Sequence, residues 1–84
     1  MNSPKNIQFT RLIKAGGRLR EFNFRKSNAI SGPMYTVDVA DHHDVRHYLI
    51  FRKDGEAWIL QSNEISNWIE EVMPQIREAL LYPE

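Results

Sequence analysis

Two adjacent glycines, Gly16 and Gly17, separate two runs of alternating residues, and this feature constrains the fold more than any other in the chain. Glycine readily adopts the positive φ that two-residue hairpin turns require. The runs on either side, 7–15 and 18–26, contain many aromatic and branched residues at every second position. They are therefore predicted to pair as an antiparallel β-hairpin.

A two-residue turn also predicts which residues of this hairpin face each other. Phe9 is expected opposite Phe24, and Arg11 opposite Phe22, so the aromatic rings share one face with arginines between them. The other face is mostly polar and is expected to meet solvent. Its members are Gln8, Thr10, Leu12, Lys14, Leu19, Glu21, Asn23 and Arg25.

Further strands are expected along the chain. Turn-forming residues mark 27–33 as a loop, and the alternation of 34–40 predicts a third strand. Asp54-Gly55 then joins runs 45–53 and 56–61 as a second hairpin, because Asp-Gly is a strong two-residue turn signal. The expected pairs are Lys53 with Glu56, Phe51 with Trp58, and Leu49 with Leu60. Tyr48, Ile50, Ala57 and Ile59 fall on the reverse face, which is unusually apolar for a solvated surface.

The last quarter of the chain has the apolar spacing of an amphipathic helix. Ser62 and Asn63 are suitable N-cap residues, and the stripe predicts a helix over 63–81, bent at Pro74. A shorter helix that ends at Met73 is the alternative. The apolar stripe comprises Ile65, Trp68, Ile69, Val72, Ile76, Ala79 and Leu80.

These elements predict an α+β fold: an antiparallel β-meander of four to five strands, followed by one C-terminal amphipathic helix packed on the sheet. The 84 residues are expected to form a single domain, 1–84, with the sheet over 7–61. Without an apolar N-terminal run or a membrane-length apolar segment, a cytoplasmic location with no membrane contact is expected.

A catalytic role is not expected, and neither is a cofactor. The chain has no cysteine, which excludes disulfides and thiolate chemistry, and it lacks a glycine-rich phosphate loop or a nucleophile motif. One cluster of possible metal ligands stands out, although its spacing is not diagnostic and a solvated turn is the simpler interpretation. It consists of Asp41, His42, His43, Asp44 and His47.

The charges are separated along the chain although they cancel overall. Residues 5–26 carry seven lysines and arginines against one glutamate, whereas the remainder carries four against ten acidic residues. A basic segment of this kind suggests a polyanionic partner, and aromatic rings beside arginines are typical of surfaces that bind single-stranded DNA or RNA. The candidate binding residues are Arg11, Lys14, Arg18, Arg20, Phe22, Phe24, Arg25 and Lys26. In the alternative interpretation the phenylalanines form the core, and the two charged halves complement each other within the fold or across a dimer.

Five segments together form a recognisable pattern: 13–18 with its Gly-Gly turn, the aromatic strand 22–26, strands 34–39 and 46–51, and Trp68-Ile69 of the closing helix. In these segments the sequence resembles the PUR-repeat, or Pur-alpha-like, nucleic-acid-binding family. The resemblance implies a four-stranded sheet with a C-terminal helix, often paired with a second unit, that binds single-stranded or purine-rich DNA or RNA. The predicted strand 56–61 is additional to that pattern.

Two functions are therefore expected. The first is a homodimeric binder of single-stranded nucleic acid that uses the basic hairpin. The second is a protein-interaction or assembly domain without a nucleic-acid role, which makes contact through Tyr48, Ile50 and Ile59.

Overall fold

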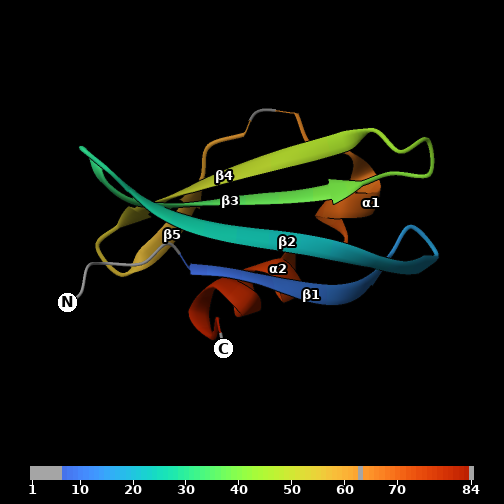
Figure 1. Ribbon diagram of the computed structural model, residues 1–84, viewed down its shortest axis with the longest axis horizontal. Coiled ribbons are helices and arrows are strands. Elements are labelled where there is room, and N and C mark those ends of the chain that lie inside the picture. Colours follow the sequence, from blue (N-terminus) through green and yellow to red (C-terminus); the bar gives the residue numbers. More distant parts are fainter. Residues whose placement is uncertain (1–6, 63, 84) are drawn as a thin grey trace.

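Five antiparallel strands joined by short turns form one sheet in the computed structural model, which describes residues 7–62 and 64–83 (Figure 1). Each strand pairs with the next along the chain, so the sheet is a meander and the predicted α+β class is confirmed. The strands are β1 (Ile7–Ala15), β2 (Arg18–Ala29), β3 (Gly32–Ala40), β4 (Arg46–Asp54) and β5 (Ala57–Leu60).

The first hairpin has the predicted register. Phe9 lies opposite Phe24 and Arg11 opposite Phe22, with Ala15 and Arg18 closing the turn. Both turn glycines have positive φ, 63° at Gly16 and 85° at Gly17. Residues other than glycine rarely adopt this backbone conformation, so two adjacent glycines identify the turn in the sequence.

The predicted loop over 27–33 is wrong, because β2 and β3 continue through it. Ser27 pairs with Met34 and Ala29 with Gly32, leaving a tight turn at Ile30-Ser31. Gly32, at φ 122°, provides the unusual backbone conformation beside the turn. The turn-forming residues thus indicated correctly that the chain reverses, but not that the reversal is only two residues long.

The second predicted hairpin forms with a register different from the expected one. Lys53 pairs with Trp58 rather than Glu56, and Phe51 pairs with Leu60 rather than Trp58. The turn residues are Gly55 and Glu56, with Gly55 at φ 64°. Because the register differs by an even number of residues, every side chain keeps its predicted face.

The predicted single helix over 63–81 is replaced by two short helices, α1 (Asn67–Glu70) and α2 (Met73–Leu81). Pro74 lies in the first turn of α2, where its missing N–H costs nothing, so it begins a new helix instead of bending a longer one. The predicted cap also differs. Asn63 lies outside the described residues, and the Ser62 Oγ accepts a hydrogen bond from the Ile50 N–H at 3.1 Å.

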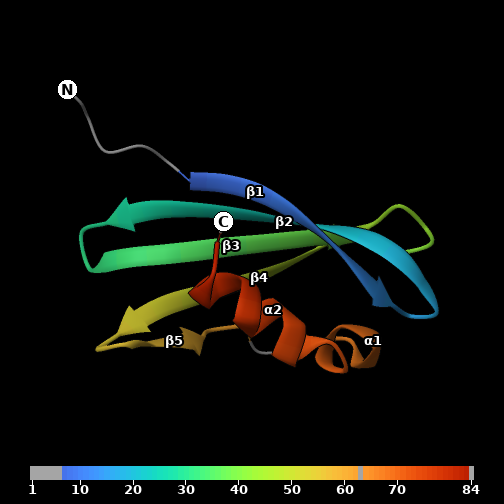
Figure 2. The ribbon, with the colours of Figure 1, turned by 90° about the horizontal axis from the view of Figure 1, so that it is seen from below.

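Both helices lie on the same side of the sheet, and no part of 7–62 or 64–83 covers the other side (Figure 2). We call these the inner and outer faces. The core forms between the inner face and the apolar sides of the helices. It contains Ile13, Ala15, Phe22, Phe24, Tyr35, Val37, Val39, Leu49, Phe51, Trp58, Ile69, Val72, Ile76, Ala79 and Leu80.

Candidate functional site

The two phenylalanines considered as base-stacking groups belong to the core. Phe22 is 0 % and Phe24 is 1 % exposed, and Phe9 stacks on Phe24 with ring centroids 4.7 Å apart. Neither buried ring offers a face on which a base could stack. In this fold, their predicted binding role is therefore replaced by the alternative given above, a role in the core.

Arg11 and Arg20, also considered as phosphate-binding groups, are engaged in contacts within the chain. Arg11 Nη2 donates to the Tyr82 carbonyl at 2.6 Å, which connects β1 to the end of α2. Arg20 Nε donates to the Ala15 carbonyl at 2.8 Å and Nη1 to the Ala40 carbonyl at 3.2 Å. The guanidinium of Arg20 also lies 4.9 Å from the ring centroid of Trp68. These arginines hold the hairpin to its surroundings.

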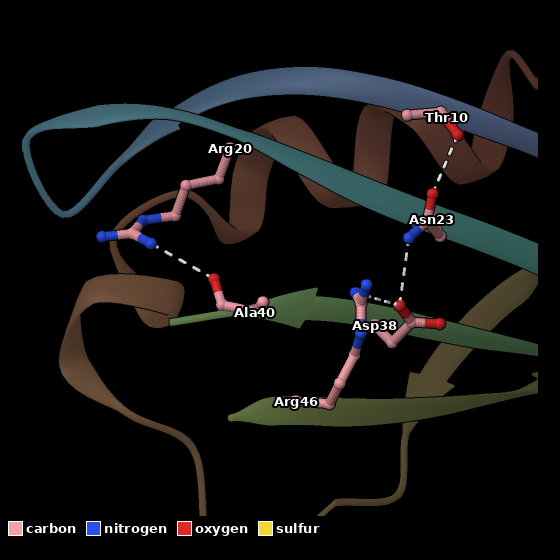
Figure 3. Close-up of polar contacts among 6 residues, drawn as sticks. All are labelled: Thr10, Arg20, Asn23, Asp38, Ala40 and Arg46. Carbon is pink, nitrogen blue, oxygen red and sulfur yellow. Dashed lines mark hydrogen bonds and ion pairs between the residues drawn. The ribbon is translucent and has the colours of Figure 1, made fainter. Parts of the chain in front are cut away.

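Arg20 lies on the part of β2 that separates from β3. The pairing between β2 and β3 ends at Asn23 and Asp38, so residues 18–22 of β2 diverge from β3 while remaining paired to β1. The bond from Arg20 to the Ala40 carbonyl bridges this opening (Figure 3). A groove of about 370 Å³ lies there and carries charges of both signs. Its charged walls include Arg18, Arg20, Glu21, Asp41, Asp44 and Arg46.

The other four predicted cations form no hydrogen bond or ion pair within 7–62 and 64–83. Lys14 and Arg25 lie on the outer face towards opposite ends of the first hairpin, opposite Leu19 and Gln8 respectively. Arg18 lies beside the Gly-Gly turn, and Lys26 is half-buried next to Ile7. These cations are available to an anion, but the fold distributes them along the hairpin instead of gathering them.

The turn after β3 is organised by the carboxylate of Asp41. Its Oδ1 accepts the N–H groups of His43 at 2.8 Å and Val45 at 3.0 Å, and its Oδ2 accepts His47 Nε2–H at 2.9 Å. The bond from His47 and then that from Val45 hold the pKa of the Asp41 carboxyl well below its usual range. The aspartate therefore has a structural role in the turn.

The remaining members of the predicted metal cluster do not join Asp41 and His47. The rings of His42 and His43 contact each other, with centroids 3.9 Å apart, and both residues are exposed. Asp44 adopts a positive φ of 67° in the turn. Across the described part of the chain, no three histidine, aspartate or glutamate side chains are grouped so that they could hold a metal ion.

A row of hydrogen bonds on the outer face was not anticipated from the sequence. Thr10 Oγ1 donates to Asn23 Oδ1 at 2.9 Å, and Asn23 Nδ2 donates to Asp38 Oδ1 at 3.1 Å. Arg46 Nη1 completes the row, 2.8 Å from the same oxygen (Figure 3). The predicted hairpin register had already placed Thr10 opposite Asn23, and this pairing was the sequence feature from which part of the row could have been predicted. We call this row, which spans β1 to β4, the polar ladder.

Three large side chains on β4 and β5 form an exposed apolar cluster on the same face. Tyr48, Ile50 and Ile59 are 60, 37 and 43 % exposed. The sequence had placed all three on this face. They lie to one side of the polar ladder, and we call them the outer patch.

Searches with family models, among curated proteins and among solved structures found no match to this chain. Among the described residues, no helix has the length and apolar character needed to cross a membrane.

Proposed function

We propose that this chain is a non-catalytic protein-interaction domain that associates with a second copy of itself through the outer patch. The observation that carries the proposal is the exposure of Tyr48, Ile50 and Ile59 on the uncovered side of a well-packed sheet. Clusters of large apolar side chains on a surface, as opposed to single ones, are characteristic of contact sites.

The strand register makes these side chains neighbours. Tyr48 and Ile50 are two residues apart on β4, so they point to the same face. Ile59 pairs with Arg52, which places it diagonally beside Ile50. Tyrosine among aliphatic groups is a common centre of protein interfaces, because its ring buries a large area while its hydroxyl can remain hydrogen-bonded.

The charges favour a second copy as the occupant. The chain has a net charge of zero, so two copies have little long-range repulsion to overcome. Both signs border the outer patch, because Arg52 pairs with Ile59 and Asp38 pairs with Tyr48. A rim of mixed sign can complement itself when two copies meet.

Sedimentation velocity over a range of protein concentrations tests this proposal. The unmodified chain is expected to show a concentration-dependent dimer, and a variant with Ile50→Lys and Ile59→Lys is expected to remain monomeric. Ile30→Lys is the matched control, because Ile30 is fully exposed in the turn after β2 and lies outside the patch. A double variant that dimerises as strongly as the control would refute the proposal.

Binding of single-stranded nucleic acid is a second candidate, supported by the four cations without a partner among the described residues: Lys14, Arg18, Arg25 and Lys26. The resemblance to PUR repeats suggests the same ligand. Fluorescence anisotropy with labelled DNA and RNA at several salt concentrations tests it, since each phosphate contact adds about −0.7 to the log–log salt slope. Replacing Arg18 and Arg25 by glutamate should abolish binding yet leave the dimer intact. Absence of binding at low salt would exclude this candidate.

A further inference from the structure

Strand β1 forms one edge of the sheet and is nine residues long. It pairs with β2 on one side. Within residues 7–62 and 64–83, no backbone hydrogen bond joins the other side of β1 to another segment. Such an edge presents N–H and C=O groups at every second residue, and an additional strand can pair with them.

The helices that cover the inner face extend beyond this edge of the sheet. The C-terminal end of α2 lies beyond β1, on the side away from β2 (Figure 1). A groove of about 260 Å³ follows the junction, lined by Arg11, Ile13, Gln75, Glu78, Ala79 and Tyr82. Its apolar members Ile13 and Ala79 belong to the core. A strand added to β1 would direct every second side chain over this groove.

The charges of the edge identify the chemistry of the added strand. Within 7–15, Arg11 and Lys14 are the charged residues, and both are basic. Arg18, Arg25 and Lys26 follow on β2, with Glu21 as the single acidic residue of that strand. Pairing β1 with its own copy would bring cations together, which is unfavourable across strands.

We infer that β1 accepts an extended acidic segment of another protein by β-strand addition. Apolar side chains of that segment would enter the groove beside α2, and its carboxylates would lie near Lys14 on the outer face. Backbone hydrogen bonds would supply affinity, and the groove and the cations would supply selectivity. This surface is distinct from the outer patch. Basic residues on an edge strand can also prevent pairing with other strands. Binding of an acidic strand distinguishes a docking role from this protective role.

The test uses the full chain and a labelled peptide as long as β1 that alternates valine and glutamate, compared with a peptide that alternates valine and lysine. Fluorescence anisotropy reports binding. Amide hydrogen exchange in the complex reports its position, because strand addition should slow exchange at alternate residues of β1. Lys14→Glu is the variant, and Lys53→Glu makes the same charge change on β4 as its control.

The glutamate peptide is expected to bind and the lysine peptide to fail. Lys14→Glu should weaken binding roughly tenfold, because it replaces an attraction by a repulsion, while Lys53→Glu should have little effect. Failure of the glutamate peptide to bind, equal binding of both peptides, or protection elsewhere than in β1 would each overturn the inference. The dimer of the outer patch would be unaffected by any of these results.

Discussion

The two faces of the sheet are built from the same strands but use their side chains differently. On the inner face, Phe22 and Phe24 pack against the helices and are almost fully buried. On the outer face, the intervening residues of β2 include Asn23 in the polar ladder and Arg25, which is exposed. Neighbouring positions along β2 thus alternate between stabilising the fold and facing solvent.

The arginines of the first hairpin show the same contrast. Arg20 on the inner face donates to two carbonyl groups and covers the ring of Trp68. Arg25 on the outer face makes no such contact within the described residues. Basic residues in a sequence therefore cannot be counted as ligand-binding until their face is known.

The largest expected difference between the two faces is in the free energy of unfolding that is lost when a side chain is truncated. Phe22→Ala is expected to lower the free energy of unfolding by about 3–5 kcal/mol, because it leaves a cavity in the core. Leu12→Ala on the outer face should change it by less than about 0.5 kcal/mol. Urea denaturation followed by circular dichroism measures both. Equal losses would contradict the assignment of the faces.

The contrast between Arg20 and Arg25 predicts a smaller difference in the free energy of unfolding. Arg20→Ala should cost about 1–3 kcal/mol, since two partly buried carbonyl groups lose a charged donor and Trp68 loses a cation. Arg25→Ala should be within about 0.5 kcal/mol of the unmodified chain. The same denaturation experiment compares them. A negligible effect of Arg20→Ala would show that its bonds do not hold the divided end of the sheet together.

The smallest expected effect concerns pH. Folding lowers the pKa of Asp41 from its ordinary 3.8, chiefly through the bond from His47. A carboxyl with a lowered pKa stabilises the fold above its unfolded pKa, and this contribution is lost as the pH falls through the folded value. Stability should therefore decline below about pH 3.8, and His47→Ala should make the decline shallower. Thermal denaturation across this range measures it, and an unchanged slope in the variant would contradict the role of His47.

The sequence was sufficient for the architecture because the relevant signals are local. Gly16-Gly17 allowed the first register to be predicted, and the alternation of β4 and β5 allowed the outer patch to be placed correctly. The position of the second turn was less accessible. Asp54-Gly55 favours a two-residue turn at those positions, but the chain turns one residue later, at Gly55 and Glu56.

The roles of individual polar residues could not be predicted, because they depend on distant segments. Arg20 is positioned by the divergence of β2 from β3 and by a tryptophan on α1. To predict the polar ladder, the register between β2, β3 and β4 would have to be known, and no turn of recognisable type indicated that register. Pro74 likewise lies in the first turn of a new helix because Val72, just before α2, departs from the helical conformation.

Nuclear magnetic resonance spectra recorded over a dilution series test most directly the claim that the uncovered face is the contact surface. Side-chain resonances of Tyr48, Ile50 and Ile59 are expected to shift with concentration, whereas those of the inner-face residues Val37 and Val39 should not. Shifts confined to α2, or spectra that do not depend on concentration, would contradict the proposed self-association.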